Sequence, residues 1–165
     1  MKISFVLPHK KEGFTLVELL IVMAILGILA TLGISNFQTA RVKARDAKRK
    51  SDLQTVAKSL EAYVNDHSAY PLSSDGEIIC QPPATTCAWD TPFLDANGTI
   101  YAATLPIDDL SPTQEYYYIT TDVGKSYTLY THLENSNDPS IIDSLGQECG
   151  TDLECNFKIT SSNIQ

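Results

Sequence analysis

An uninterrupted apolar run near the N-terminus dominates the hydropathy pattern of this chain. From Phe14 to Ile34 the only ionisable residue is Glu18. Built as a helix at about 1.5 Å per residue, this run would extend for roughly 30 Å, the thickness of the hydrocarbon core of a bilayer. The rest of the 165-residue chain is too small to surround a helix that is apolar on all sides. The pattern therefore predicts a membrane-spanning segment rather than a buried core helix.

Beyond the apolar run, the spacing becomes that of an amphipathic helix. Apolar residues recur three or four positions apart, at Leu53, Val56, Ala57, Leu60, Tyr63 and Val64. Residues 35–69 contain no proline or glycine, so one helix is expected from about Phe14 to about Asn65, ending before Tyr70-Pro71. Its first part, residues 14–35, would cross the membrane or form a filament core. Its continuation, residues 36–69, would lay an apolar stripe on a sheet.

The remaining chain predicts a connecting loop followed by a small sheet. Residues 70–98 are rich in Pro, Ser, Thr, Asp and Gly and are interpreted as a long loop, with Asn97-Gly98-Thr99 read as a tight turn rather than a glycosylation site. Residues 99–165 would form the sheet, with a hairpin connection at 122–125. The strands are expected at residues 101–105, 116–121, 126–133 and 157–160. The predicted fold class is therefore α+β, a long N-terminal helix packed on an antiparallel sheet of three to four strands.

Four cysteines occur as two close pairs, Cys80 with Cys87 and Cys149 with Cys155. No CxxC motif or histidine at ligand spacing supports a zinc site. Cysteines in a small domain beyond a membrane segment indicate disulfides and an oxidising compartment, with reduced cytosolic thiols as the alternative. Three connectivities are possible, and the one with two local pairs is favoured. These pairs would staple the connecting loop and a C-terminal loop.

Charge is divided unevenly along the chain. Ten of the 12 basic residues lie in residues 1–58, whereas residues 59–165 hold two basic and 16 acidic residues. The acidic C-terminal part, here called the head, argues against nucleic-acid binding. It could instead attract cations or the basic N-terminal part of a neighbouring copy. The basic cluster from Arg41 to Lys50 would contact acidic heads or lipid headgroups, or form a solvated helix face. By the positive-inside rule this cluster would place the head in the cytoplasm, which conflicts with the interpretation of the cysteines.

The residues at the start of the apolar run resolve this conflict. The segment from Lys10 to Leu20, with Gly-Phe-Thr-Leu-Val-Glu at its centre, resembles the class III signal sequence of type IV pilins and type II secretion pseudopilins. The resemblance implies that residues 1–13 are a leader peptide, which a prepilin peptidase removes between Gly13 and Phe14 on the cytoplasmic side. It also implies methylation of the new amino terminus of Phe14. Glu18 would pair with the terminal ammonium of a neighbouring subunit and set axial register.

The resemblance implies a structural filament subunit and not an enzyme. The expected partners are further copies of the chain, the prepilin peptidase, an inner-membrane assembly platform with its separate ATPase, and membrane lipid before assembly. The head would be extracytoplasmic, first anchored to the inner membrane and then part of a periplasmic or cell-surface filament. A membrane-anchored binding or adhesion module is the alternative, and a tethered enzyme is disfavoured because the sequence offers no catalytic constellation. Ser35 departs from the proline common in the family at this point, so the backbone hydrogen bond is kept there.

Some members of the pseudopilin branch bind calcium through loop oxygens. The hard oxygen ligands that this chain could offer are Glu134, Asn135, Asn137 and Asp138. These residues match no ligand pattern that can be transferred position by position, so a polar turn ending at Asp138-Pro139 is favoured. The sequence therefore predicts no cofactor, with calcium as a weak alternative.

Overall fold

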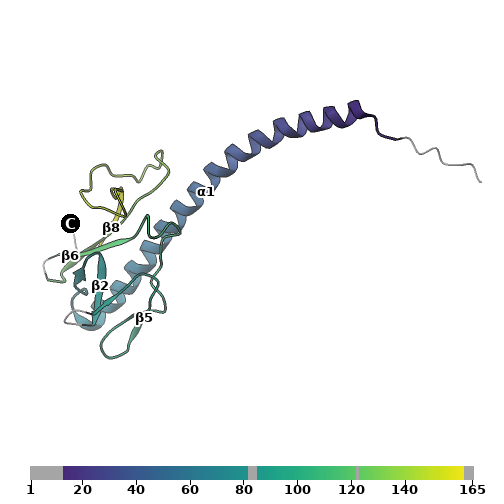
Figure 1. Ribbon diagram of the computed structural model, residues 1–165. Helices are drawn as coiled ribbons and strands as arrows, with labels where there is room; N and C mark the ends of the chain where they lie inside the picture. The colour runs from purple at the N-terminus through teal and green to yellow at the C-terminus, as the bar shows by residue number, and fades with distance from the viewer. Residues whose placement is uncertain (1–12, 82–84, 122, 162–165) are drawn as a thin grey trace, which may run out of the picture. The chain divides into compact units, whose positions relative to one another are not determined.

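The computed structural model describes residues 13–81, 85–121 and 123–161, with only the backbone described for residues 30–36. Helix α1 (Leu16–His67) precedes every strand of the described chain (Figure 1). The chain divides into an N-terminal unit that ends at Ala40 and a C-terminal unit that begins at Arg41 and is called the head from here on. The long helix is confirmed to within two residues at each end. The predicted leader lies outside the described residues, apart from Gly13.

The end of α1 is marked by a residue in the left-handed conformation. Ser68 has a φ of 62°, and its N–H donates to the carbonyl of Val64 at 2.7 Å. A residue in this conformation commonly closes a helix, because it turns the chain while satisfying a terminal carbonyl. Pro71 follows and cannot continue the helix. The sequence signals at Tyr70-Pro71 therefore place the helix end correctly.

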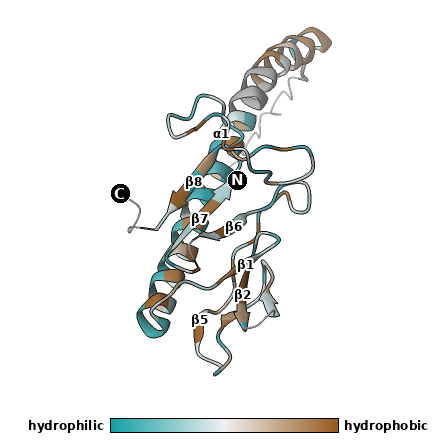
Figure 2. Ribbon diagram, turned by 90° about the vertical axis from the view of Figure 1, so that its left-hand side faces the viewer, coloured by the Kyte–Doolittle hydropathy of each residue, from teal (hydrophilic) through white to brown (hydrophobic). Residues whose placement is uncertain are grey.

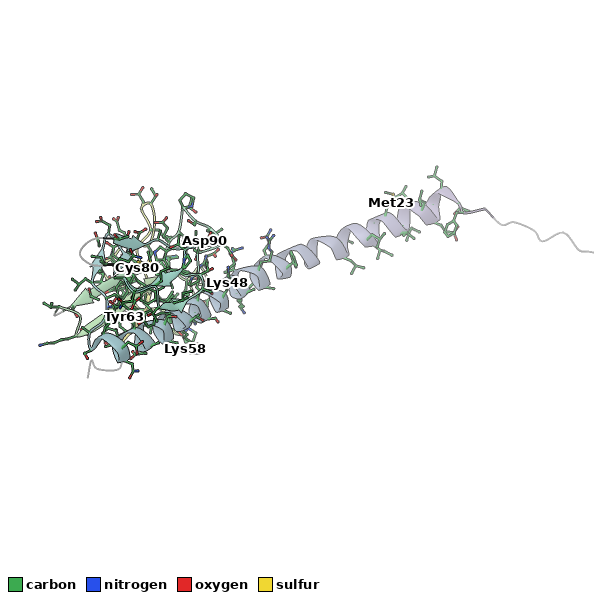
Figure 3. All side chains as sticks on the ribbon, turned by 90° about the horizontal axis from the view of Figure 1, so that it is seen from below. Met23, Lys48, Lys58, Tyr63, Cys80 and Asp90 are labelled. Atoms are coloured by element: carbon green, nitrogen blue, oxygen red, sulfur yellow. A yellow bond between two sulfur atoms is a disulfide. The ribbon has the colours of Figure 1, made fainter. Side chains whose placement is uncertain are left out.

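In the N-terminal unit, most of the described part of α1 has the colour of hydrophobic residues (Figure 2). Large apolar residues from Phe14 to Leu29 are between 46% and 84% exposed, and Figure 3 shows Met23 projecting from the helix. Within the described residues, no helical stretch is long and apolar enough to cross a membrane. The span predicted for residues 14–35 stays a prediction.

The described residues of the head form three small antiparallel sheets beside the second part of α1 (Figure 1). The first sheet comprises β1 (Ser73–Ser74), β2 (Glu77–Gln81) and β3 (Thr85–Cys87). The second comprises β4 (Phe93–Leu94) and β5 (Ile100–Ala102). The third has the order β6 (Tyr117–Thr121), β7 (Ser126–Thr131) and β8 (Phe157–Thr160).

The third sheet contains the strands predicted at residues 116–121, 126–133 and 157–160. The strand predicted at residues 101–105 is instead the shorter β5, which pairs with β4 in the second sheet. Residues 122–125 connect β6 to β7, and the register pairs Thr121 with Ser126 beside this connection. The interpretation of residues 70–98 as a loop was wrong in part, because β1 to β4 lie within it. These strands are two to five residues long, and β1 is simply Ser-Ser, so they carry little of the alternation that identifies a strand. The turn predicted at residues 97–99 connects β4 to β5.

The core of the head forms where the apolar stripe of α1 meets the sheets. Leu53, Val56 and Leu60 are at most 1% exposed, as the three- and four-residue spacing predicts. Strand β7 alternates in burial, so every second residue points toward the helix. The strand residues packed into this core include Ile78, Phe93, Tyr118, Tyr127 and Leu129. The core therefore holds the second part of α1 firmly against the sheets.

Candidate functional site

The residues at the predicted cleavage point lie just outside α1. Gly13 and Phe14 are not helical, and the Phe14 side chain is 84% exposed. A Cβ atom placed on Gly13 would meet no described atom within 4 Å. Nothing in the packing of the described chain therefore requires glycine at this position.

Thr15 and Glu18 form a capping box at the start of α1. The Glu18 N–H donates to the Thr15 hydroxyl at 3.2 Å, and the Thr15 N–H donates to the Glu18 carboxylate at 3.1 Å. The Thr15 hydroxyl also donates to that carboxylate at 3.0 Å. This reciprocal pattern satisfies N–H groups that have no partner inside the helix. The Thr-x-x-Glu spacing was visible in the sequence, but this role of Glu18 was missed.

The four cysteines form the two local disulfides favoured from the sequence. Cys80 pairs with Cys87, with 5.7 Å between their Cα atoms, and joins β2 to β3. Cys149 pairs with Cys155, with a Cα separation of 5.1 Å, and closes a loop before β8. All four are buried, at most 7% exposed. The disulfides thus staple a short hairpin and a C-terminal loop.

The two carboxylates among the calcium candidates are bound by cations of α1. Glu134 accepts hydrogen bonds from Arg45 Nε at 2.7 Å and Arg49 Nη1 at 2.6 Å. Asp138 accepts from Lys50 Nζ at 2.7 Å. The described residues contain no group of three or more His, Cys, Asp or Glu side chains placed to hold a metal ion.

The two asparagines among the calcium candidates lie in the same turn. The backbone N–H of Asn135 donates to Asp46 Oδ2 at 2.8 Å, and its side-chain oxygen accepts from the backbone N–H of Asn137 at 3.4 Å. The Asp138 N–H closes the turn by donating to the Asn135 carbonyl at 2.9 Å. This is the polar turn that the sequence favoured, and it is attached to α1.

Arg49 lies at the centre of the charged contacts between α1 and the loops. Its side chain is 2% exposed and donates to Asp46 at 2.8 Å, to Asp108 at 2.6 Å and to Glu134 at 2.6 Å. A buried charge is tolerated only when it is paired and hydrogen-bonded, and Arg49 meets both conditions. We call the set Arg45, Arg49, Lys50, Asp108, Glu134 and Asp138 the clamp.

The clamp changes the acidity of its loop carboxylates. The hydrogen bond from Arg45, followed by that from Arg49, lowers the pKa of Glu134 to about 2. The hydrogen bond from Lys50 lowers the pKa of Asp138. Both carboxylates therefore stay ionised well into the acidic range and hold the loop after β7 against α1.

The basic cluster of α1 is largely committed to acids of its own chain. Arg45, Arg49 and Lys50 belong to the clamp, and Lys48 pairs with Asp109 in a contact where both side chains are nearly half exposed. The alternative of a solvated helix face is therefore wrong for Arg45, Arg49 and Lys50, whereas Lys48 is exposed. Sequence reasoning missed these acidic partners because they lie 59 to 89 positions away along the chain.

Comparison with known proteins supports the resemblance. The family model described as the prokaryotic N-terminal methylation motif matches residues 8–34. The chain is 28% identical over 124 residues to the type II secretion system core protein G of Pseudomonas aeruginosa, covering 74% of this chain and 83% of that protein. The methylation motif and this relative support the assignment of the chain to the type IV pilin and type II secretion pseudopilin family. Its α+β architecture, a long helix packed on antiparallel sheets, is consistent with the pilin fold.

Two other core proteins G match a smaller part of this chain. The Dickeya chrysanthemi protein is 36% identical over 70 residues, covering 42% of this chain and 46% of that protein. The Klebsiella pneumoniae protein is 35% identical over 86 residues, covering 51% of this chain and 61% of that protein. No solved structure gives a significant match. The matched methylation motif contains Gly13, Phe14 and the capping box.

Proposed function

We propose that this chain is a prepseudopilin or prepilin that becomes the structural subunit of a filament after processing. A prepilin peptidase removes residues 1–13, the amine of Phe14 is methylated, and the subunits polymerise through α1. The observation that carries the proposal is the methylation motif at residues 8–34. The similarity of the chain to the type II secretion core proteins G supports it. The subunit awaits assembly in the inner membrane, and it enters the fibre from an assembly platform driven by a separate ATPase.

The environment of Gly13 supports processing at this point. A Cβ atom on Gly13 would lie within 4 Å of no described atom, so packing within the described chain does not require glycine there. A residue without a side chain does suit a narrow protease subsite, and it lets the chain extend across that site. We therefore attribute the glycine at this position to recognition by the peptidase.

The exposed apolar surface of α1 supports anchoring and polymerisation. Large side chains from Phe14 to Leu29 are 46% to 84% exposed, far more apolar surface than an isolated soluble helix normally presents. Lipid would cover this surface before assembly, and the helices of other subunits would cover it in the fibre. The two disulfides support an oxidising, extracytoplasmic location for the head.

Glu18 has one partner in its own chain and gains another in the fibre under this proposal. Its carboxylate accepts two hydrogen bonds from Thr15, which leaves lone pairs for the ammonium of a neighbouring Phe14. Pairing these two charges would favour one axial position of the entering subunit over others. Glu18 is therefore proposed to set the register of assembly.

Mass spectrometry of the mature N-terminus tests the processing step. In cells that contain the peptidase, the mature chain should begin at Phe14 and carry a methylated amine. A Gly13→Val variant should keep its leader, because the larger side chain blocks the subsite. A mature chain that begins at Met1, or after Ser35, would contradict the proposal.

A pair of variants tests the register role. Glu18→Val should be cleaved normally but should form few or no fibres in electron micrographs. Thr15→Ala is the matched control, because it weakens the cap of α1 while keeping the carboxylate. Fibre loss of equal size in both variants would assign the defect to the helix start, and normal fibres from Glu18→Val would exclude the register role.

A further inference from the structure

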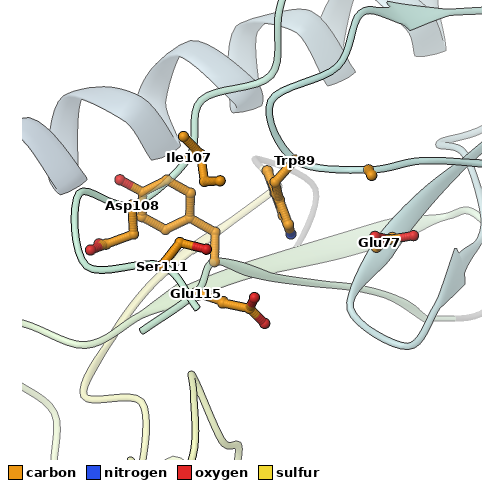
Figure 4. Close-up of a pocket in the computed structure, with 8 residues that line it drawn as sticks. Glu77, Trp89, Ile107, Asp108, Ser111 and Glu115 are labelled. Atoms are coloured by element: carbon orange, nitrogen blue, oxygen red, sulfur yellow. The ribbon is translucent and has the colours of Figure 1, made fainter. Parts of the chain in front are cut away.

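A pocket of about 220 Å³ lies in the head (Figure 4). Its walls come from β2, from the residues after β3 and from the segment that precedes β6. The residues that line it are Glu77, Ala88, Trp89, Ile107, Asp108, Ser111, Glu115 and Tyr116. The pocket thus combines an aromatic surface with carboxylates from separate parts of the chain.

The aromatic wall of the pocket is held in place. The Trp89 ring meets the Tyr116 ring edge to face, with 5.6 Å between centroids and 80° between planes. Tyr116 is 2% exposed, and its hydroxyl donates to Asp52 on α1 at 2.7 Å. Trp89 is only partly buried, so part of its indole surface is available to an occupant of the pocket.

The pocket carries an uncompensated negative charge within the described chain. Asp108 is neutralised by Arg49 in the clamp. Glu77 and Glu115 appear in none of the described ion pairs, and Glu115 is exposed. Two carboxylates beside an indole suit a cation on an apolar stem, because the charge meets the carboxylates while the stem and cation contact the ring. A lysine side chain has this chemistry.

The charge distribution indicates where such a lysine comes from. Residues 59–165 contain only two basic residues, Lys125 and Lys158, against 16 acidic ones. Most of the basic cluster of α1 is committed to the clamp and to Asp109. Lys43 and Lys58 are exposed on α1 and appear in none of the described ion pairs. In a polymer of one chain, every subunit would present both an acidic pocket and these exposed lysines.

We propose that the pocket at Trp89 receives Lys43 or Lys58 of a second copy of this chain in the filament. The inference rests on the proposed function, because the two copies meet only when subunits assemble. The contact adds a charge-matched interaction between heads to the apolar packing of the N-terminal helices. It favours association of a head with the basic helix of a neighbour over head-to-head contact, where like charges would repel.

Charge reversal tests the contact in cells that assemble the wild-type chain. A Glu77→Lys/Glu115→Lys variant should lower fibre yield by at least about tenfold, since like charges at an interface cost more than the roughly 1.4 kcal/mol that a factor of ten represents. Asp143→Lys is the control, because Asp143 is an exposed acid that does not line the pocket. Circular dichroism of each variant checks that the head still folds. Adding Lys43→Glu or Lys58→Glu to the double variant should restore fibres and identify the lysine.

Crosslinking supplies a second readout. All four native cysteines are in disulfides, so cysteines introduced at Glu115 and at Lys43 or Lys58 provide the only thiols. A short bismaleimide should link subunits in sheared fibres through one of the two pairs but should not link detergent-dispersed subunits. Undiminished fibres from the double variant, or fibres without either crosslink, would overturn this inference alone. Absence of fibres from the wild-type chain would overturn the proposed function and this inference together.

Discussion

Glu134→Gln removes one carboxylate from the clamp while nearly preserving its shape. The Glu134 side chain is 21% exposed and bonds two guanidinium groups, which lower its pKa from 4.5 to about 2. At about 1.4 kcal/mol for each pKa unit, this difference corresponds to about 3 kcal/mol of folding free energy at neutral pH. The amide keeps part of the hydrogen bonding, so we expect the substitution to lower the free energy of unfolding by about 2 kcal/mol.

The effect should depend on pH in a defined direction. The pKa of Glu134 is lower in the folded chain than in the unfolded chain, so its contribution is complete above about pH 4.5 and is lost as the pH falls through about 2. The difference between wild type and Glu134→Gln should therefore shrink steadily from pH 5 to pH 2. Urea unfolding followed by fluorescence of Trp89, the only tryptophan in the chain, measures this difference at each pH.

Asp109→Asn provides the matched control. Asp109 also pairs with a cation of α1, but its side chain is 47% exposed and that of Lys48 is 48% exposed. Exposed pairs of this kind contribute about 0 to 1 kcal/mol, so the loss should be well below that of Glu134→Gln. Equal losses in the two variants, or a Glu134→Gln loss that is the same at pH 7 and pH 2, would refute the assignment of the clamp as a buried ionic contact.

Three further substitutions test separate features of the head, each by its urea midpoint. Cys80→Ser/Cys87→Ser should lower stability by about 2 to 3 kcal/mol, as expected for a short disulfide loop, and reductant should then shift the variant less than the wild type. Thr131→Val should raise stability by about 1 kcal/mol, because the Thr131 hydroxyl is buried without a partner among the described residues; a loss would reveal a hidden hydrogen bond. Val123→Asn should also add about 1 kcal/mol, because Val123 has a φ of 57° that asparagine tolerates better, and an unchanged midpoint would show that the turn relaxes at no cost.

Features with a short repeat in the sequence were predictable. The apolar spacing from Leu53 to Val64 identified the amphipathic part of α1, and alternation identified β6 and β7 with their hairpin. Local signals also favoured the two disulfide pairs, because neighbouring cysteines need only a short loop to meet. The paired cysteines are six or seven positions apart, and β6 and β7 follow one another directly along the chain, so the sequence order itself places these partners together.

Features that depend on distant partners were not predictable. The carboxylates of Asp108 and Glu134 meet Arg49 only after the chain has folded, and their spacing in the sequence carries no period that links them. The strands β1 to β4 are too short to show alternation, and their pairing depends on the core that forms around them. The capping box differs, because Thr15 and Glu18 are three residues apart and a search for caps at the start of the apolar run would have found it.

The capping box also determines what a peptidase would encounter at residues 13 and 14. Helix α1 begins at Leu16. The Thr15 hydroxyl accepts from the Glu18 N–H, and the Glu18 carboxylate accepts from the Thr15 N–H. The bond between Gly13 and Phe14 therefore precedes the first residue that contributes to the hydrogen-bond network of the helix. A cut at that bond would release the leader without unwinding any helical turn. The helix of the precursor and the helix of the product would be the same structure, and only the charge in front of it would change.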